Sequence, residues 1–158
     1  MVTITKSTIL SGIWQNFYDR IKSQVTSVAT GLTDVGTSTV QTYSSNYSDK
    51  ISIEKASYPI ITVEHPVIDT ELFTFGKTTV NGTISVEVFA NQSVTSVLLI
   101  DSVINAIETF KGSLAALGIT ELDIDSTDND NFKRGALNVH SRLVRFKFKY
   151  RYTRTRAW

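Results

Sequence analysis

The spacing of the apolar residues changes abruptly within one stretch of the chain, residues 79–117. Between Gly82 and Ala90 they occupy every second position, which is the period of a strand with one buried face. From Ser93 to Phe110 they recur at intervals of three and four, the period of an amphipathic helix of about five turns. A strand that runs directly into such a helix constrains the chain to a sheet with helices packed on it.

The limits of this helix are also marked in the sequence. Asn91, Gln92 and Ser93 are all suited to capping its start. Gly112 and Gly118 are placed to end it in one or two steps, because glycine readily adopts the left-handed conformation of helix ends.

A first helix is predicted from Ser7 to about Ser27. Its apolar positions recur at helical spacing: Leu10, Ile13, Trp14, Phe17, Ile21, Val25 and Val28. We interpret Trp14 and Phe17 as core anchors that pack on the sheet; a ligand-binding aromatic pair is the alternative.

The segment of residues 26–50 loses this periodicity. From Thr26 to Ser48, 11 of 23 residues are Ser or Thr, which is typical of a long polar loop. A hairpin or extra strand between Val40 and Tyr47 is the alternative.

The middle of the chain is divided by turn residues. The Tyr58-Pro59 pair precedes a predicted strand at 60–64, and Pro66 ends that strand. Gly76-Lys77 and Asn81-Gly82 are predicted turns, the second being a pair that favours tight hairpins.

Two further strands are predicted in the last third. Residues 119–124 alternate and lead into a predicted acidic turn at 126–131. The closing strand covers 136–153, but its apolar residues change phase between Val139 and Val144. One strand keeps both on one face only if a bulge inserts a residue near 141–143, so we predict such a bulge or a break into two strands.

These elements predict one α+β domain, residues 1–152, with a mostly antiparallel sheet of about four strands packed against two helices. The long polar loop or hairpin at 26–50 and an extended basic tail at 153–158 complete it. A chain of 158 residues is long enough for one such core.

Composition excludes several classes of protein. Cysteine is absent, so neither a disulfide framework nor a thiolate metal site is possible. Residues 1–10 are too polar for a signal peptide, and no apolar run approaches the roughly 18 residues of a membrane span. We therefore expect a protein made in the cytoplasm of its host cell, with no membrane partner.

The net charge of +1 conceals a strong asymmetry along the chain. Residues 1–132 hold 7 bases against 15 acids, a net charge of −8, whereas residues 133–158 hold 9 bases and no acid. Such a division suggests a charged partner or neighbouring subunit, or neutralisation within the fold.

The basic residues are the most suggestive candidate site. Alternation places one set of cations on one strand face, and more basic residues and a tryptophan follow: Arg145, Lys147, Lys149, Arg151, Arg154, Arg156 and Trp158. The interleaved aromatic residues superficially resemble a nucleic-acid platform, but alternation puts rings and charges on opposite faces. A solvated or intersubunit strand face is favoured, with Trp158 as a candidate anchor on another subunit.

The acidic residues form a second candidate site, and they too alternate: Glu121, Asp123, Asp125, Asp128 and Asp130. A calcium loop of the helix-loop-helix type needs glycine at its sixth position and glutamate at its twelfth, where this chain has Asp128 and Arg134. A solvated acidic loop is the preferred interpretation.

Catalytic and cofactor motifs are missing from the sequence. His65 and His140 are 75 residues apart with no third histidine, which excludes a histidine-rich zinc site. Neither a nucleophile-elbow nor a phosphate-loop motif occurs. We therefore predict no enzyme, no metal and no cofactor.

The order of elements resembles the tail terminator proteins of long-tailed bacteriophages, also called tail-completion or neck proteins. The resemblance covers residues 7–152 and lies in that order and in segments such as YPIITVE and GTISVEVFANQSVTSVLLIDSVINAIETF. It implies an α+β fold and a homo-oligomeric, six-membered ring in the virion. This ring would cap the tail tube protein, end tube polymerisation and join the tail to the head-tail connector protein.

Within such a ring, the sequence suggests that the acidic loop of one subunit faces the basic strand or tail of the next. Two other interpretations remain open. One is a head-proximal connector or head-completion protein of the same neck. The other is a DNA-binding module, or non-specific contact with packaged DNA, through the basic strand.

Overall fold

The computed structural model describes residues 4, 9–29, 37–44, 58–68, 79–134 and 137–151, with only the backbone given at 29, 37, 38, 44, 132, 134 and 137. Its elements in chain order are α1 (Ile9–Gln24), β1 (Ser27–Ala29), β2 (Thr37–Thr39), β3 (Gln41–Ser44), β4 (Ile60–Val63), β5 (Val67–Ile68), β6 (Thr79–Ala90), α2 (Ser93–Thr109), α3 (Lys111–Ala116), β7 (Ile119–Arg134) and β8 (Leu137–Arg151).

The predicted α+β class is confirmed, but the sheet is larger than predicted and is mixed. Six strands take part, in the order β3-β4-β6-β8-β7, with β5 pairing to β6 beyond the end of β4. The β3–β4 pair is parallel and the other pairs are antiparallel. Of the two additional strands, β3 corresponds to the alternative of an extra strand between Val40 and Tyr47, whereas β5 was not predicted. They are four and two residues long, too short to show a period.

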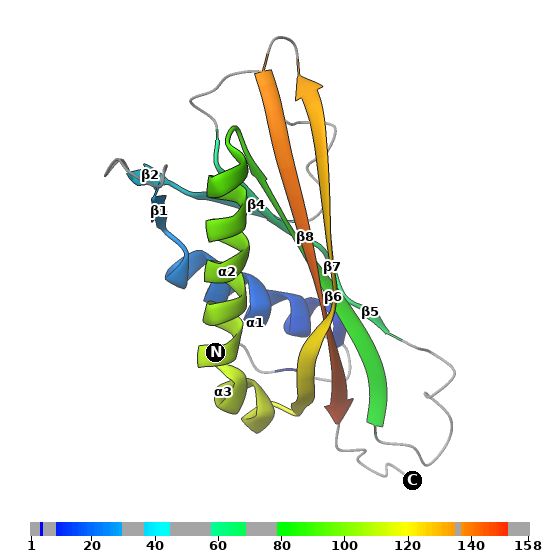
Figure 1. Cartoon of the computed structure of the whole chain (residues 1–158). Coiled ribbons are helices and arrows are strands. Elements are labelled where there is room, and N and C mark those ends of the chain that lie inside the picture. Colours follow the sequence, from blue (N-terminus) through cyan, green and yellow to red (C-terminus); the bar gives the residue numbers. More distant parts are fainter. Residues whose placement is uncertain are drawn as a thin grey trace, which may run out of the picture.

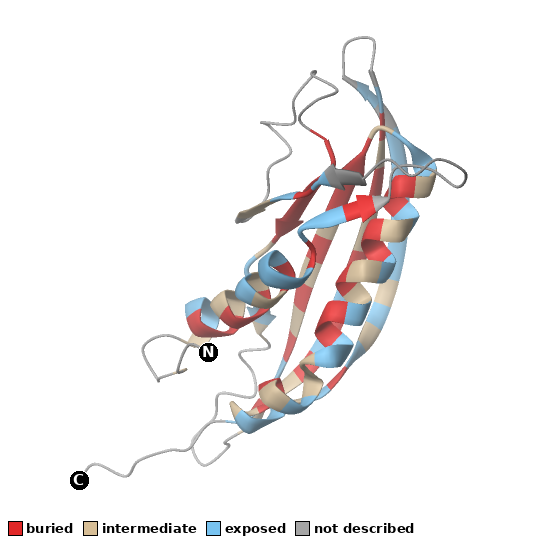
Figure 2. Ribbon diagram, turned by 90° about the vertical axis from the view of Figure 1, so that its left-hand side faces the viewer, coloured by how far each residue is buried: buried red, intermediate tan, exposed pale blue. Residues whose placement is uncertain are grey.

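All three helices lie on one face of the sheet, which we call the inner face (Figure 1). Helix α2 follows β6 directly and runs along the sheet, while α1 crosses beside it. The main core fills the space between these layers, with apolar side chains from α1, α2, α3 and the long strands, and Figure 2 shows the buried positions along these elements. Hydrophobic burial between one sheet face and the helices therefore holds the fold together.

The alternation of β6 and β8 sets this core. Their even-numbered apolar residues, which include Ile84, Val86, Phe146 and Phe148, are at most 3% exposed. Phe17 of α1 is fully buried against the two phenylalanines, with ring centroids 6.4 Å from Phe146 and 5.9 Å from Phe148.

The predicted helix of residues 93–110 is confirmed as α2, but the prediction that Gly112 ends it is wrong. Helix α2 ends before Phe110, and Gly112 lies inside the short α3. Gly118 does follow the end of α3, with a positive φ of 96°. The described part of the chain therefore has three helices rather than two.

The predicted turn at Asn81-Gly82 is also wrong, because both residues lie inside β6. Gly82 pairs with Phe148, and a Cβ atom on Gly82 would lie 2.7 Å from the ring of that phenylalanine. The glycine serves a close approach between neighbouring strands rather than a turn.

Both alternatives predicted for the closing strand, a bulge at 141–143 or a break into two strands, are wrong. β8 pairs with β6 without interruption from Ala90↔His140 to Thr79↔Arg151. Val139 is buried on the other face of the sheet, in a second small cluster with Tyr58, Ile60 and Phe89. Apolar side chains cover both faces of the sheet at this end. Val139 on one face of β8 and the even-numbered apolar residues on its other face are therefore both buried.

The irregularities lie instead in β7, with register shifts between Thr120 and Asp123 and between Ile124 and Ser126. Glu121, at the first shift, has a positive φ of 51°. Residues 126–131, predicted as an acidic turn, continue β7. The resulting β7–β8 hairpin extends past the start of α2 (Figure 1).

The polar segment of residues 26–50 contains three short strands within its described part. β1 and β2 pair as an antiparallel hairpin, and β3 joins the main sheet. Residues 30–36, 45–50 and the tail at 153–158 lie outside the described residues.

No helix in the described part of the chain is long and apolar enough to cross a membrane.

Candidate functional site

The outer face of the sheet carries a row of four cations on β8, which we call the cationic strip: Arg145, Lys147, Lys149 and Arg151. The rings that alternate with them, Phe146, Phe148 and Tyr150, are 1–3% exposed and face the core. The predicted separation of rings from charges is therefore confirmed, and these rings cannot stack on nucleic-acid bases.

The acidic residues of β7 lie directly beside this strip in the same chain. Asp123 is the register partner of Lys147. The Glu121 carboxylate is 2.9 Å from the Lys149 ammonium, and Arg145 Nη1 donates to Ser126 Oγ at 3.3 Å. Part of the charge asymmetry of the sequence is therefore neutralised within the fold.

Three cations of the strip are left without an internal counter-ion. Among the described residues, Arg145, Lys147 and Arg151 form no ion pair, and all three are exposed. On β6, the neighbouring outward positions are the neutral Asn81, Thr83 and Ser85. Among the described residues of β6 and β8, this half of the outer face is thus polar and positively charged.

The other predicted site residues divide into two groups. Asp123, Asp125 and Asp128 are exposed on β7. Arg154, Arg156 and Trp158 lie outside the described residues. Within the described part of the chain, no group of three or more His, Asp or Glu side chains is arranged to hold a metal ion.

A carboxylate that sequence analysis missed, Glu87 of β6, lies farther along the outer face. It accepts a hydrogen bond of 2.6 Å from the hydroxyl of the buried Ser141. Burial raises the pKa of Glu87, as do the nearby carboxylates of Glu64 and Asp130, while the Ser141 hydrogen bond acts in the opposite direction. In the sequence Glu87 is an ordinary outward position of a strand, so no local signal marks it.

This raised pKa predicts a pH-dependent stability. The folded protein binds the Glu87 proton more tightly than the unfolded chain, so this carboxyl destabilises the fold increasingly as pH rises from its unfolded pKa of about 4.5 through its folded pKa. We expect Glu87→Gln to be slightly more stable than wild type at pH 7. The gain should vanish below pH ~4, where both side chains are neutral. Thermal unfolding at the two pH values checks this, and an equal gain at both would contradict it.

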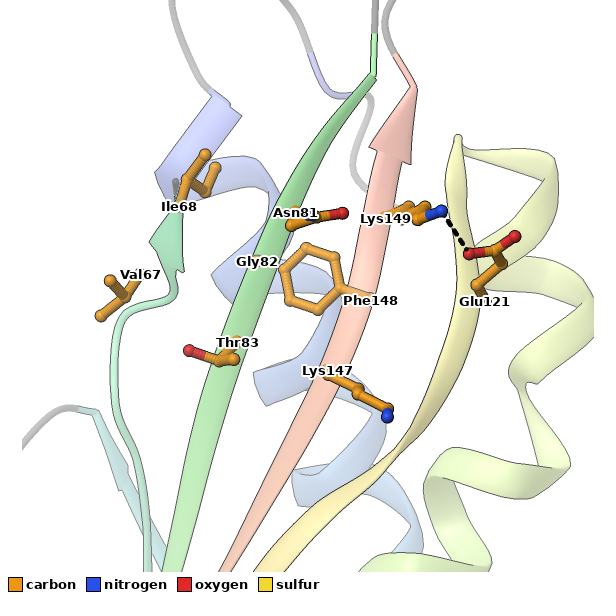
Figure 3. A pocket seen from close by; sticks show the side chains of 9 residues that line it. All are labelled: Val67, Ile68, Asn81, Gly82, Thr83, Glu121, Lys147, Phe148 and Lys149. Carbon is orange, nitrogen blue, oxygen red and sulfur yellow. Dashed lines mark ion pairs between the residues drawn. The ribbon is translucent and has the colours of Figure 1, made fainter. Parts of the chain in front are cut away.

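A hollow of about 510 Å³ lies along β5, β6 and β8 (Figure 3). Lys147, Lys149 and Glu121 line it together with Val67, which is 70% exposed. Residues 69–78, which connect β5 to β6, lie outside the described residues, so we assign no ligand to this hollow.

The two aromatic residues predicted as core anchors have different roles. Phe17 is a fully buried core anchor. Trp14 is half-buried and packs against the same core, and it also stacks with Tyr18 and the exposed His65, with centroid distances of 4.8 and 5.0 Å. Trp14 Nε1 donates to the Val63 carbonyl at 2.9 Å. This bond and the stacking fix α1 to the end of β4.

Comparison with protein-family models and with curated proteins finds no match to this chain.

Proposed function

We propose that the protein is a structural subunit of the phage virion, a tail terminator that forms a ring, caps the tail tube, ends its polymerisation and joins the tail to the head connector. The resemblance in element order and the α+β fold support this proposal. The observation that carries it is the positively charged half of the outer face, where Lys147 and Arg151 have no counter-ion within the described chain. An exposed, charged surface of this kind suits a protein partner of complementary charge.

The described helices, on the inner face of the sheet, form no uniformly acidic surface. They carry both signs of charge: Asp19, Arg20 and Lys22 on α1, Asp101 and Glu108 on α2, and Lys111 on α3. In a ring, each subunit contacts the next through two different surfaces. A head-to-tail arrangement would therefore set the cationic strip of one copy against a different surface of its neighbour, whereas the acids of β7 already flank the strip within one chain.

The test is the mass of the purified protein by light scattering, with negative-stain imaging and with tail-tube protein added. We expect six-membered rings that bind tube ends and weaken as salt rises, because exposed charge pairs are screened beyond about 10 Å at 0.1 M salt. A monodisperse monomer that forms no ring even with tube protein would contradict the proposal. Binding at the portal side of the neck instead of the tube would favour the head-proximal connector.

A charge-reversed variant makes the test specific. Lys147→Glu with Arg151→Glu should abolish rings at physiological salt. The matched control is Lys111→Glu with Lys22→Glu, which reverses two cations on helices away from the strip and should leave ring mass unchanged. Equal loss of rings in both variants would show that net charge, not the strip, controls assembly.

Contact with packaged DNA is the second candidate for the same surface. Cations on alternate strand residues are about 7 Å apart along β8, and the neighbouring side chains are neutral and polar. Such a surface can hold a phosphate backbone without reading bases. DNA affinity that falls steeply with salt and is lost in the strip variant would favour this candidate.

A further inference from the structure

Strand β7 is an edge strand. It pairs with β8 along one side, and no other described strand pairs with it on the other. Edge strands of this length present backbone N–H and C=O groups that another chain can pair with, so natural proteins protect them. How β7 is protected can be determined from its hydrogen bonds.

The backbone bonds fix which N–H groups of β7 point outward. The N–H of Arg151 donates to the Gly118 carbonyl at 2.8 Å, so odd-numbered residues of β8 direct their backbone groups toward β7 and even-numbered ones toward β6. Residues of β7 that oppose even-numbered β8 residues therefore point their N–H groups away from β8. Ile124, Asn129 and Asn131 belong to this set, since they oppose Phe146, Arg142 and His140.

Each of these three outward N–H groups is already occupied. The carboxylate of the preceding aspartate, Asp123, Asp128 or Asp130, accepts it through Oδ1 at 2.8 Å. A new strand could pair here only by displacing these bonds and burying the carboxylates, which costs free energy for each group. We propose that the three aspartates block strand addition to the β7 edge by an extended segment of a second copy of this chain.

The arrangement is selective rather than a general property of acidic residues. Asp125, exposed on the same strand, makes no such bond among the described residues. Thr127 opposes Val144, so its N–H also points outward, but the Ser126 hydroxyl before it accepts from Arg145 instead. These two residues supply internal references for the test.

The experiment compares three triple variants by light scattering at matched concentration. Alanine at 123, 128 and 130 removes both charge and acceptor, and should raise the mass-average mass about two-fold or more above the wild-type oligomer, as edges pair. Asparagine at the same positions removes the charge and keeps a side-chain acceptor, and should leave the mass unchanged. The control, Asp19→Ala with Asp101→Ala and Asp125→Ala, removes equal charge elsewhere and should also leave it unchanged.

Other outcomes overturn the proposal. Growth of the asparagine or control variant as large as that of the alanine variant would show that charge repulsion protects the edge, and no growth in any variant would show that the edge is not protected by these groups.

If the alanine variant does not fold, amide hydrogen exchange in the wild type decides. The amides of 124, 129 and 131 should exchange about tenfold more slowly than that of Thr127, and equal rates would contradict the inference. Neither measurement depends on whether the protein is a tail terminator.

Discussion

Phe17→Ala is expected to lower the free energy of unfolding by about 3–5 kcal/mol, the usual cost of removing a fully buried aromatic side chain. Phe17 has no exposed surface and joins α1 to the sheet through Phe146 and Phe148. The substitution leaves a cavity between the two layers that rigid strands cannot close. Urea unfolding, followed by circular dichroism, measures the loss.

The matched control lies on the same helix. Leu10 is 49% exposed, so Leu10→Ala should change stability by no more than about 0.5 kcal/mol. A loss below about 1 kcal/mol for Phe17→Ala, or equal losses in the two variants, would mean that α1 does not pack on the sheet as described.

Gly118→Ala is expected to destabilise the protein by about 3 kcal/mol, because two effects combine. The φ of 96° is unfavourable for any residue with a side chain. In addition, a Cβ atom would overlap the carbonyl oxygen of Arg151. The same backbone junction is held by the bond from the Arg151 N–H to the Gly118 carbonyl, so relieving the overlap would break the start of the β7–β8 pairing.

A second glycine tests whether this effect is local. Gly112 lies inside α3, and a Cβ atom there would meet nothing within 4 Å. Gly112→Ala should therefore stabilise the protein by about 0.5–1 kcal/mol, since alanine is the better helix former. Opposite signs for two glycines six residues apart are expected in thermal unfolding. Destabilisation by both substitutions would contradict the placement of Gly112 inside α3, the helix that ends at Ala116.

The proposed ring contact and the protected edge agree with each other physically. If the outer face of one subunit contacts a different surface of the next, the ring closes through side-chain surfaces. An unprotected β7 edge would offer a competing contact through backbone hydrogen bonds. The geometry of that contact would not have to produce a closed ring. The three aspartates occupy three outward N–H groups and so remove this competing contact. In return, their three carboxylates are held in fixed positions.

The candidate site was only partly accessible from sequence. Alternation along β8 was sufficient to place Lys147 and Lys149 opposite Phe146 and Phe148, because a strand has a period of two wherever it lies. The pairing of Lys149 with Glu121 was not accessible, since it depends on how β7 is bulged against β8. The environment of Glu87 likewise arises from Ser141, 54 residues away in sequence.

The amino-acid sequence by itself determined which face of each long element is buried, because the periods of β6, α2 and β8 are local properties of the chain. Only the tertiary structure decided where a second layer covers the other face. Val139 is out of phase with the main core, and the sequence therefore predicted a bulge in β8 or a break into two strands. Instead, Val139 is buried on the other face of the sheet in a cluster with Tyr58, Ile60 and Phe89. Burial depends on what lies opposite, and neighbours across a sheet come from distant parts of the chain.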